Sequence, residues 1–105
     1  MSAKRKRLRR NIVELCRELI DGATDFVSGS RALRKLYLEV PDTEKTMFFP
    51  IIGFESETDD YSLGEERKKY DQESLKKLDY QMADYTLRAK HSVLAACQTL
   101  IKFYA

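Results

Sequence analysis

The feature that most constrains the fold of this chain is a long apolar repeat in its last third. Apolar residues recur there at steps of three or four, and no glycine or proline follows Gly64. Such steps place side chains on one face of an α-helix. The repeat comprises Leu75, Leu78, Met82, Tyr85, Ala89, Val93, Ala96, Leu100 and Phe103. It predicts one helix over about residues 71–103, roughly 50 Å long, with Asp71 as its N-cap.

Two shorter helices are expected earlier in the chain. Apolar residues between Leu8 and Ile20 form one stripe, and Gly22 is placed to end that helix in the left-handed conformation. A second helix is predicted over about residues 28–39, before Pro41. The short connection between them favours antiparallel packing.

The long helix carries a second, weaker stripe. Its members recur every seven residues and are Tyr80, Leu87, Leu94 and Ile101. This stripe indicates a second contact surface, and a homodimer through the long helix is one candidate for it.

Residues 42–71 connect the second helix to the last one. Asp42 to Lys45 are expected to form a short helical turn. Phe49 to Phe54 are expected to be extended, because Pro50 breaks a helix and large apolar residues surround it. The predicted fold is mainly α: one domain over residues 1–105, a bundle of three to four helices with a long C-terminal helix and a short extended, acidic insert.

Charge is unevenly distributed along the chain. Residues 1–41 hold ten basic and five acidic side chains, residues 42–73 hold four and ten, and residues 74–105 hold five and two. Six carboxylates lie within residues 55–66. This acidic segment between basic helices is the main electrostatic feature of the sequence.

Neither a metal site nor an enzyme active site is expected. Cys16, Cys97 and the single His91 do not have zinc-ligand spacing, and both cysteines fall in apolar patterns typical of reduced core thiols. A calcium loop starting at Glu55 would need glycine at its sixth position, where Asp60 stands. No cofactor is expected. Without a run of 18 apolar residues or a signal-peptide pattern, we expect a cytoplasmic protein that does not enter a membrane.

The acidic segment is interpreted as a docking surface for another protein with a basic surface. Dense carboxylates speed association with a positively charged partner, and nearby tyrosines supply contact area. The residues expected to bind the partner are Glu55, Glu57, Asp59, Asp60, Tyr61 and Tyr70. A solvated turn, in which Ser56 and Thr58 only cap neighbouring backbone groups, remains the alternative.

The basic run near the start of the chain suggests a second function, that of a nucleic-acid-binding accessory domain. Its candidate phosphate contacts are Lys4, Arg5, Lys6, Arg7, Arg9 and Arg10. The acidic middle third, the net charge of only +2 and the lack of aromatic residues within the run all count against it. Pairing of the run with the acidic segment is an equally simple explanation, so nucleic acid is the less favoured partner.

The stretch Glu55-Ser56-Glu57-Thr58-Asp59 resembles a family of small uncharacterised bacterial helical domains with a DSETDxxPxG motif. The matching residues are Ser56, Glu57, Thr58, Asp59, Gly64, Arg67, Ala96 and Cys97, while Glu55, Ser62 and Tyr70 replace the family's aspartate, proline and tryptophan. The resemblance implies that Ser56, Thr58, Gly64 and Arg67 shape a turn. Such domains in turn resemble small immunity proteins, which implies neutralisation of a bacterial toxin by binding, without catalysis.

Overall fold

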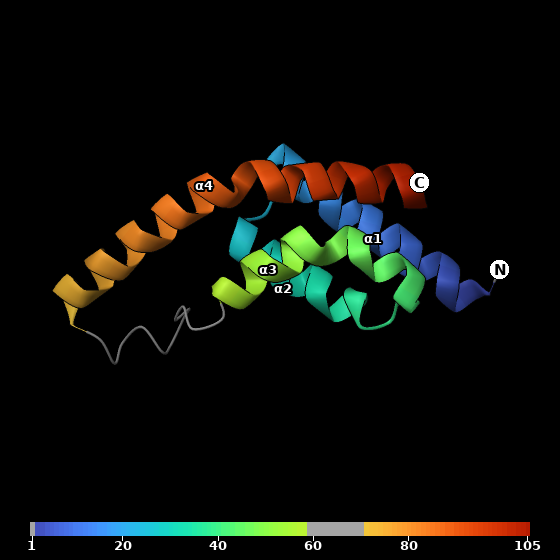
Figure 1. Ribbon diagram of the computed structural model, residues 1–105, viewed down its shortest axis with the longest axis horizontal. Helices are drawn as coiled ribbons and strands as arrows, with labels where there is room; N and C mark the ends of the chain where they lie inside the picture. The colour runs from blue at the N-terminus through green and yellow to red at the C-terminus, as the bar shows by residue number, and fades with distance from the viewer. Residues whose placement is uncertain (1, 59–70) are drawn as a thin grey trace.

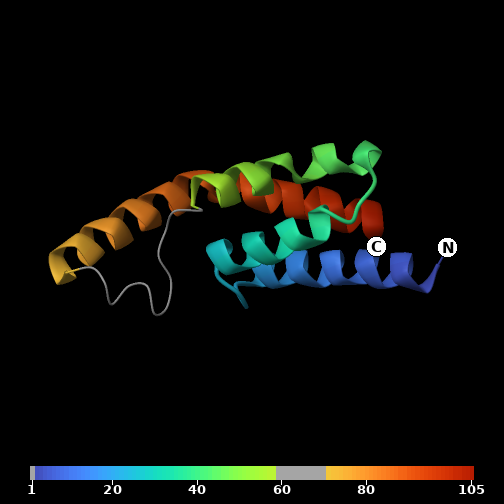
Figure 2. The same cartoon turned by 90° about the horizontal axis from the view of Figure 1, so that it is seen from below.

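The computed structural model describes residues 2–58 and 71–105, and almost all of these are helical. The elements in chain order are α1 (Ala3–Asp21), α2 (Phe26–Tyr37), the 3₁₀ helix η1 (Asp42–Phe48), α3 (Phe49–Glu57) and α4 (Gln72–Tyr104). The α-helices alternate in direction, with α1 and α2 in one layer and α3 and α4 in the other (Figures 1 and 2). The predicted mainly α bundle with one long last helix is confirmed.

Local sequence signals set most helix ends. The side chains of Asp25 and Asp71 each accept a hydrogen bond from the backbone N–H three residues later, at 2.8 Å, and so cap α2 and α4. Gly22 ends α1 with φ of 78°. The predictions for Gly22 and Asp71 are confirmed, and α2 begins two residues before its predicted start because Asp25 caps it.

Gly22 and Gly53 form a matched pair for testing backbone conformation. A Cβ added at either position would meet no other part of the molecule within 4 Å, but Gly22 has a positive φ whereas Gly53 lies within α3. Gly22→Ala should cost about 1 kcal/mol because a Cβ disfavours the left-handed region. Gly53→Ala should stabilise by about 0.5–1 kcal/mol through better helix propensity. Urea unfolding measures both, and equal effects would contradict the assignment of left-handed backbone to Gly22.

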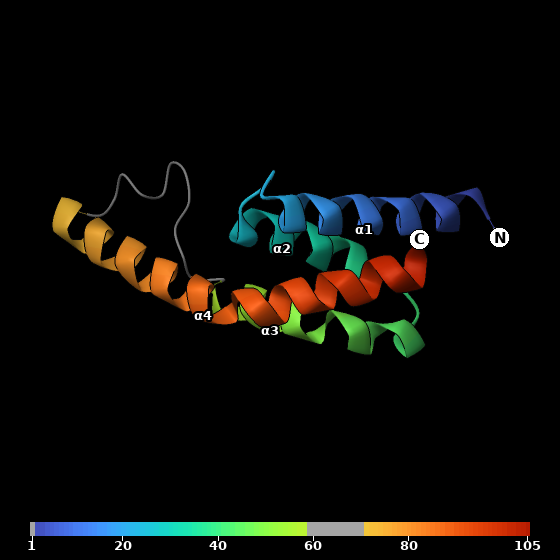
Figure 3. The same ribbon diagram turned by 90° about the horizontal axis from the view of Figure 1, so that it is seen from above.

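The hydrophobic core lies where the second half of α4 crosses α1. Its largest fully buried side chains include Ile12 and Leu19 of α1, Phe48 of η1 and Leu100 of α4. Cys16 and Cys97 are buried free thiols. The neighbouring Cys97 thiol and burial raise the pKa of Cys16, so this thiol stays neutral. The first turns of α4 extend beyond the other helices (Figure 3).

The prediction that residues 49–54 are extended is wrong, because they form the first part of α3. Pro50 lies in the first turn of that helix, where a missing N–H breaks no hydrogen bond and the fixed φ suits the helix. Glu55 and Glu57 therefore belong to the last turn of a helix and not to a loop. Among the described helices, none combines the length and apolarity needed to cross a membrane.

Candidate functional site

Glu55, the first residue of the predicted acidic surface, is largely withdrawn from solvent. It is 7% exposed, and its Oε2 lies 3.2 Å from Nε of Arg34 on α2. An arginine of the same chain therefore neutralises this carboxylate, and the pair ties α3 to α2. Glu55 serves the packing of the bundle and is not available to a partner.

Thr58 ends α3 and anchors the start of the acidic segment. Its buried hydroxyl donates to the carbonyl oxygens of Phe54 at 2.9 Å and Glu55 at 3.2 Å. The carbonyl oxygen of Thr58 accepts a hydrogen bond from Arg31 of α2 at 3.1 Å. These bonds satisfy polar groups at the helix end, as expected of a structuring residue. Ser56 is exposed. The predictions for Asp59, Asp60, Tyr61, Gly64, Arg67 and Tyr70 lie outside the described residues.

Glu57 is exposed and lies at the end of α3 that faces α4. The rings of Phe54 and Tyr85 stack there, with centroids 5.7 Å apart and an interplanar angle of 8°. Burial, followed by the negative charge of Glu57, raises the pKa of Tyr85. The solvent-facing carboxylate of α3 thus lies near the middle of α4.

An apolar groove runs between the start of α2 and the middle of α4. It has a volume of about 530 Å³ and is lined by Asp25, Phe26, Val27, Met82, Ala83, Thr86, Leu87 and Lys90. Leu87 is 72% exposed, and Tyr80, seven residues earlier on the same face of α4, is 82% exposed. We name Phe26, Tyr80 and Leu87 the α4 apolar surface. The first two members of the seven-residue stripe are solvent-facing, whereas Leu94 and Ile101 are half-buried.

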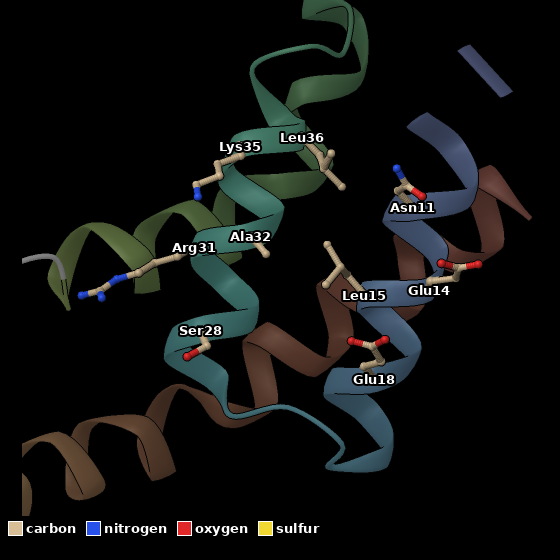
Figure 4. Close-up of a pocket in the computed structure, with 9 residues that line it drawn as sticks. All are labelled: Asn11, Glu14, Leu15, Glu18, Ser28, Arg31, Ala32, Lys35 and Leu36. Atoms are coloured by element: carbon tan, nitrogen blue, oxygen red, sulfur yellow. The ribbon is translucent and has the colours of Figure 1, made fainter. Parts of the chain in front are cut away.

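A second groove lies between α1 and α2, with opposite charges along its two sides. Glu14 and Glu18 come from α1, Arg31 and Lys35 from α2, and half-buried Leu15 and Leu36 face each other across its floor (Figure 4). Arg31 already donates to the carbonyl of Thr58. The lining of this groove is less apolar than that of the groove between α2 and α4, so it offers a partner less binding energy from apolar burial.

At the end of the molecule where α1 begins and α4 ends, Arg5, Glu44 and Tyr104 form a polar cluster that we name the Glu44 cluster. These residues are distant from one another in the sequence. Nη2 of Arg5 lies 2.5 and 2.6 Å from the two carboxylate oxygens of Glu44, and the hydroxyl of Tyr104 donates to the same carboxylate at 2.6 Å. The hydrogen bond from Arg5 lowers the pKa of Glu44, more than burial raises it. The cluster joins the start of α1 to η1 and to the end of α4. Arg5 therefore pairs with Glu44, which lies outside the acidic segment.

A basic groove lies beside this cluster. It has a volume of about 600 Å³ and is lined by Lys6, Arg9, Arg10, Val13, Glu14, Arg17, Tyr104 and Ala105. The guanidinium of Arg9 lies 5.5 Å from the ring centroid of Tyr104 and donates to the carbonyls of Phe103 and Tyr104 at 3.4 and 3.3 Å. The predicted basic run therefore divides between residues that hold the fold, Arg5 and Arg9, and residues that face solvent: Lys4, Lys6, Arg7 and Arg10.

Sequence reasoning missed two features of these surfaces. The aromatic residues beside the basic run come from α4, about 95 residues away, and no local pattern shows this proximity. The exposure of Tyr80 and Leu87 was signalled by their seven-residue spacing, but the contribution of Phe26 was not. No family model, curated protein or solved structure matches the chain.

Proposed function

We propose that the chain is a non-catalytic protein-binding module. The observation that carries the proposal is the α4 apolar surface, on which Tyr80 is 82% and Leu87 is 72% exposed. Both side chains lie on a helix whose first turns extend beyond the bundle (Figure 1). Tyrosine is among the residues that most often dominate binding energy. Leu87 on the same face, and a groove that contains Phe26 and Met82, add apolar area to this surface.

The partner we propose is a protein with apolar side chains inside a basic rim. Glu57 lies close to Tyr85 of α4, and the acidic segment continues from it in the sequence through Asp59 and Asp60. Tyr85 and Leu87 are two residues apart and therefore lie on different sides of α4. A partner that covers both sides would bring positive charge at its rim close to Glu57, which raises the association rate. Glu55 is omitted from this surface because Arg34 pairs with it.

The specific role we propose is neutralisation of a bacterial toxin in the cytoplasm. A toxin that acts on nucleic acid has a basic cleft, and an apolar surface flanked by carboxylates is suited to cover one. The buried free thiols Cys16 and Cys97 are consistent with a reducing compartment. Tyr61 and Tyr70 remain proposed anchors on sequence grounds.

The proposal predicts that Tyr80→Ala with Leu87→Ala abolishes partner capture. The tagged chain would be recovered from its native cells with its bound partner, and the captured toxin would be assayed for loss of its activity. Truncating two central anchors should weaken binding at least about 30-fold, since each is expected to contribute about 1 kcal/mol or more. The folded state should be unaffected because both side chains are exposed.

Leu38→Ala with Phe49→Ala is the matched control. These side chains are also large, apolar and exposed, at 61% and 54%, but lie elsewhere on the bundle. The control should retain the partner. Equal loss in both double variants would contradict the assignment of the surface, and retention by the Tyr80 and Leu87 variant would overturn the proposed function. A further variant, with Glu57, Asp59 and Asp60 changed to their amides, should slow association at low salt.

A further inference from the structure

From the basic groove at the other end of the bundle, we infer that the chain also binds single-stranded nucleic acid, through its phosphate backbone. This site is independent of the α4 apolar surface. The start of α1 and the end of α4 lie together at one end of the molecule, while the first turns of α4 form the opposite end (Figures 1 and 3).

The charge on the outer side of α1 is not neutralised by any ion pair within residues 2–58 and 71–105. Lys4, Lys6, Arg7, Arg10 and Arg17 are exposed, and none has an ion-pair partner in the part of the chain that the structure describes. Lys6, Arg10 and Arg17 line the groove itself, together with one acidic side chain, that of Glu14. Unpaired cations around a groove attract a polyanion, and release of its counterions drives the binding.

The cations of the groove are spaced to follow an extended backbone. Lys6 and Arg17 are eleven residues apart on a continuous helix, so they are separated by about 16 Å along its axis. At the spacing of roughly 3.4 Å along one strand of a duplex, that span would correspond to about five nucleotides, and an extended single strand would cover it with fewer. A series of contacts over such a length fits a polymer of phosphates better than a single small anion.

The packing at the end of α4 orients the groove. Arg5 is held by Glu44, and Arg9 is held by the Tyr104 ring and the last carbonyls of α4, so both act as positioning residues. Phe103 is 48% exposed and packs edge-on against Tyr104 at 4.9 Å. An exposed aromatic ring next to a basic groove is a stacking platform for an unpaired base.

The surroundings favour a nucleic acid over an anionic membrane. The apolar face of α1 is buried in the core through Leu8, Ile12, Cys16 and Leu19. An interfacial helix binds a bilayer by inserting its apolar face. Because α1 has no such face to offer, its cations are better suited to phosphates that approach from solvent.

The test is fluorescence anisotropy with a labelled single-stranded oligonucleotide of mixed sequence and with the matching duplex. Binding to the single strand should weaken as salt increases, with a slope of log K against log salt of about −2 for about three phosphate contacts. Lys6→Glu with Arg10→Glu should weaken binding at least about tenfold and flatten that slope. Phe103→Ala should weaken binding of the single strand more than binding of the duplex.

Two further variants guard against unfolding and non-specific charge effects. Lys76→Glu with Lys77→Glu makes the same charge change at exposed positions near the opposite end of the molecule, and should leave binding within about twofold. Glu14→Gln should tighten binding, which a misfolded variant would not do. The inference would be overturned if the two double variants, at Lys6 and Arg10 and at Lys76 and Lys77, weakened binding equally. It would also be overturned if the duplex bound more tightly than the single strand, or if the chain bound phosphatidylserine vesicles but no oligonucleotide.

Discussion

Replacement of Phe48 by alanine is expected to lower the free energy of unfolding by about 3–5 kcal/mol. Phe48 is fully buried, and its ring lies 5.5 Å from that of Tyr37 and 6.4 Å from that of Tyr104. The side chain thus joins η1 to α2 and to the end of α4. Its removal loses apolar burial and leaves a cavity between elements that cannot close independently.

The next residue in the chain provides the control for this prediction. Phe49 is 54% exposed, and Phe49→Ala should change stability by no more than about 0.5 kcal/mol. Urea unfolding followed by circular dichroism would measure both variants, with the slope against urea unchanged if both still fold. If the alanine variant fails to fold, Phe48→Leu can be measured in its place. This change removes less volume, so the loss of unfolding free energy should be smaller. Similar losses at both positions would contradict the packing of η1.

Replacement of Glu44 by glutamine is expected to cost about 2 kcal/mol at pH 7, because the guanidinium of Arg5 and the hydroxyl of Tyr104 lose a charged acceptor. The pKa of Glu44 is lowered in the folded state, chiefly by the hydrogen bond from Arg5. Its contribution is therefore present above the unfolded pKa of about 4.3 and is lost as pH falls through the lower folded value. The difference between wild type and variant should be constant from pH 7 to 5 and should shrink below pH 4.

Tyr104→Phe separates the two hydrogen bonds to Glu44. This variant keeps the Arg5 pair, so it should cost only about 1 kcal/mol at pH 7. Burial, followed by the bond to Glu44, raises the pKa of Tyr104. The wild type should therefore lose stability as pH rises above the unfolded value of about 10, and the phenylalanine variant should lose less. Urea unfolding at pH 3, 5, 7 and 10.5 would measure stability on the acidic and on the basic side. If stability varied with pH in the same way in the wild type, Glu44→Gln and Tyr104→Phe, the Glu44 cluster would be contradicted.

The acidic segment shows how a sequence pattern can be partly redirected by packing. Six carboxylates in twelve residues predict an exposed surface, and Glu57 is exposed as expected. Glu55, two residues earlier, lies on the inner side of α3, where it meets Arg34. Because residues two apart lie on different sides of a helix, recognition of α3 as a helix would have separated them.

The sequence by itself determined the features that depend on neighbouring residues. The helical period of the last third, the cap at Asp71 and the left-handed turn at Gly22 are all confirmed. Each arises from backbone geometry and interactions within a few residues, which a linear pattern records directly. The mainly α fold follows from the same signals.

Tertiary structure alone decided which of two adjacent phenylalanines is buried, that Pro50 begins a helix, and that Arg5, Glu44 and Tyr104 meet across separations of 39 and 60 residues. It also brought Phe103 to the basic run and placed Phe26 in the groove beside Leu87. These outcomes depend on how whole helices cross and on which faces they cover. Burial and long-range pairing are properties of the packed bundle, so the local sequence around each residue does not contain them.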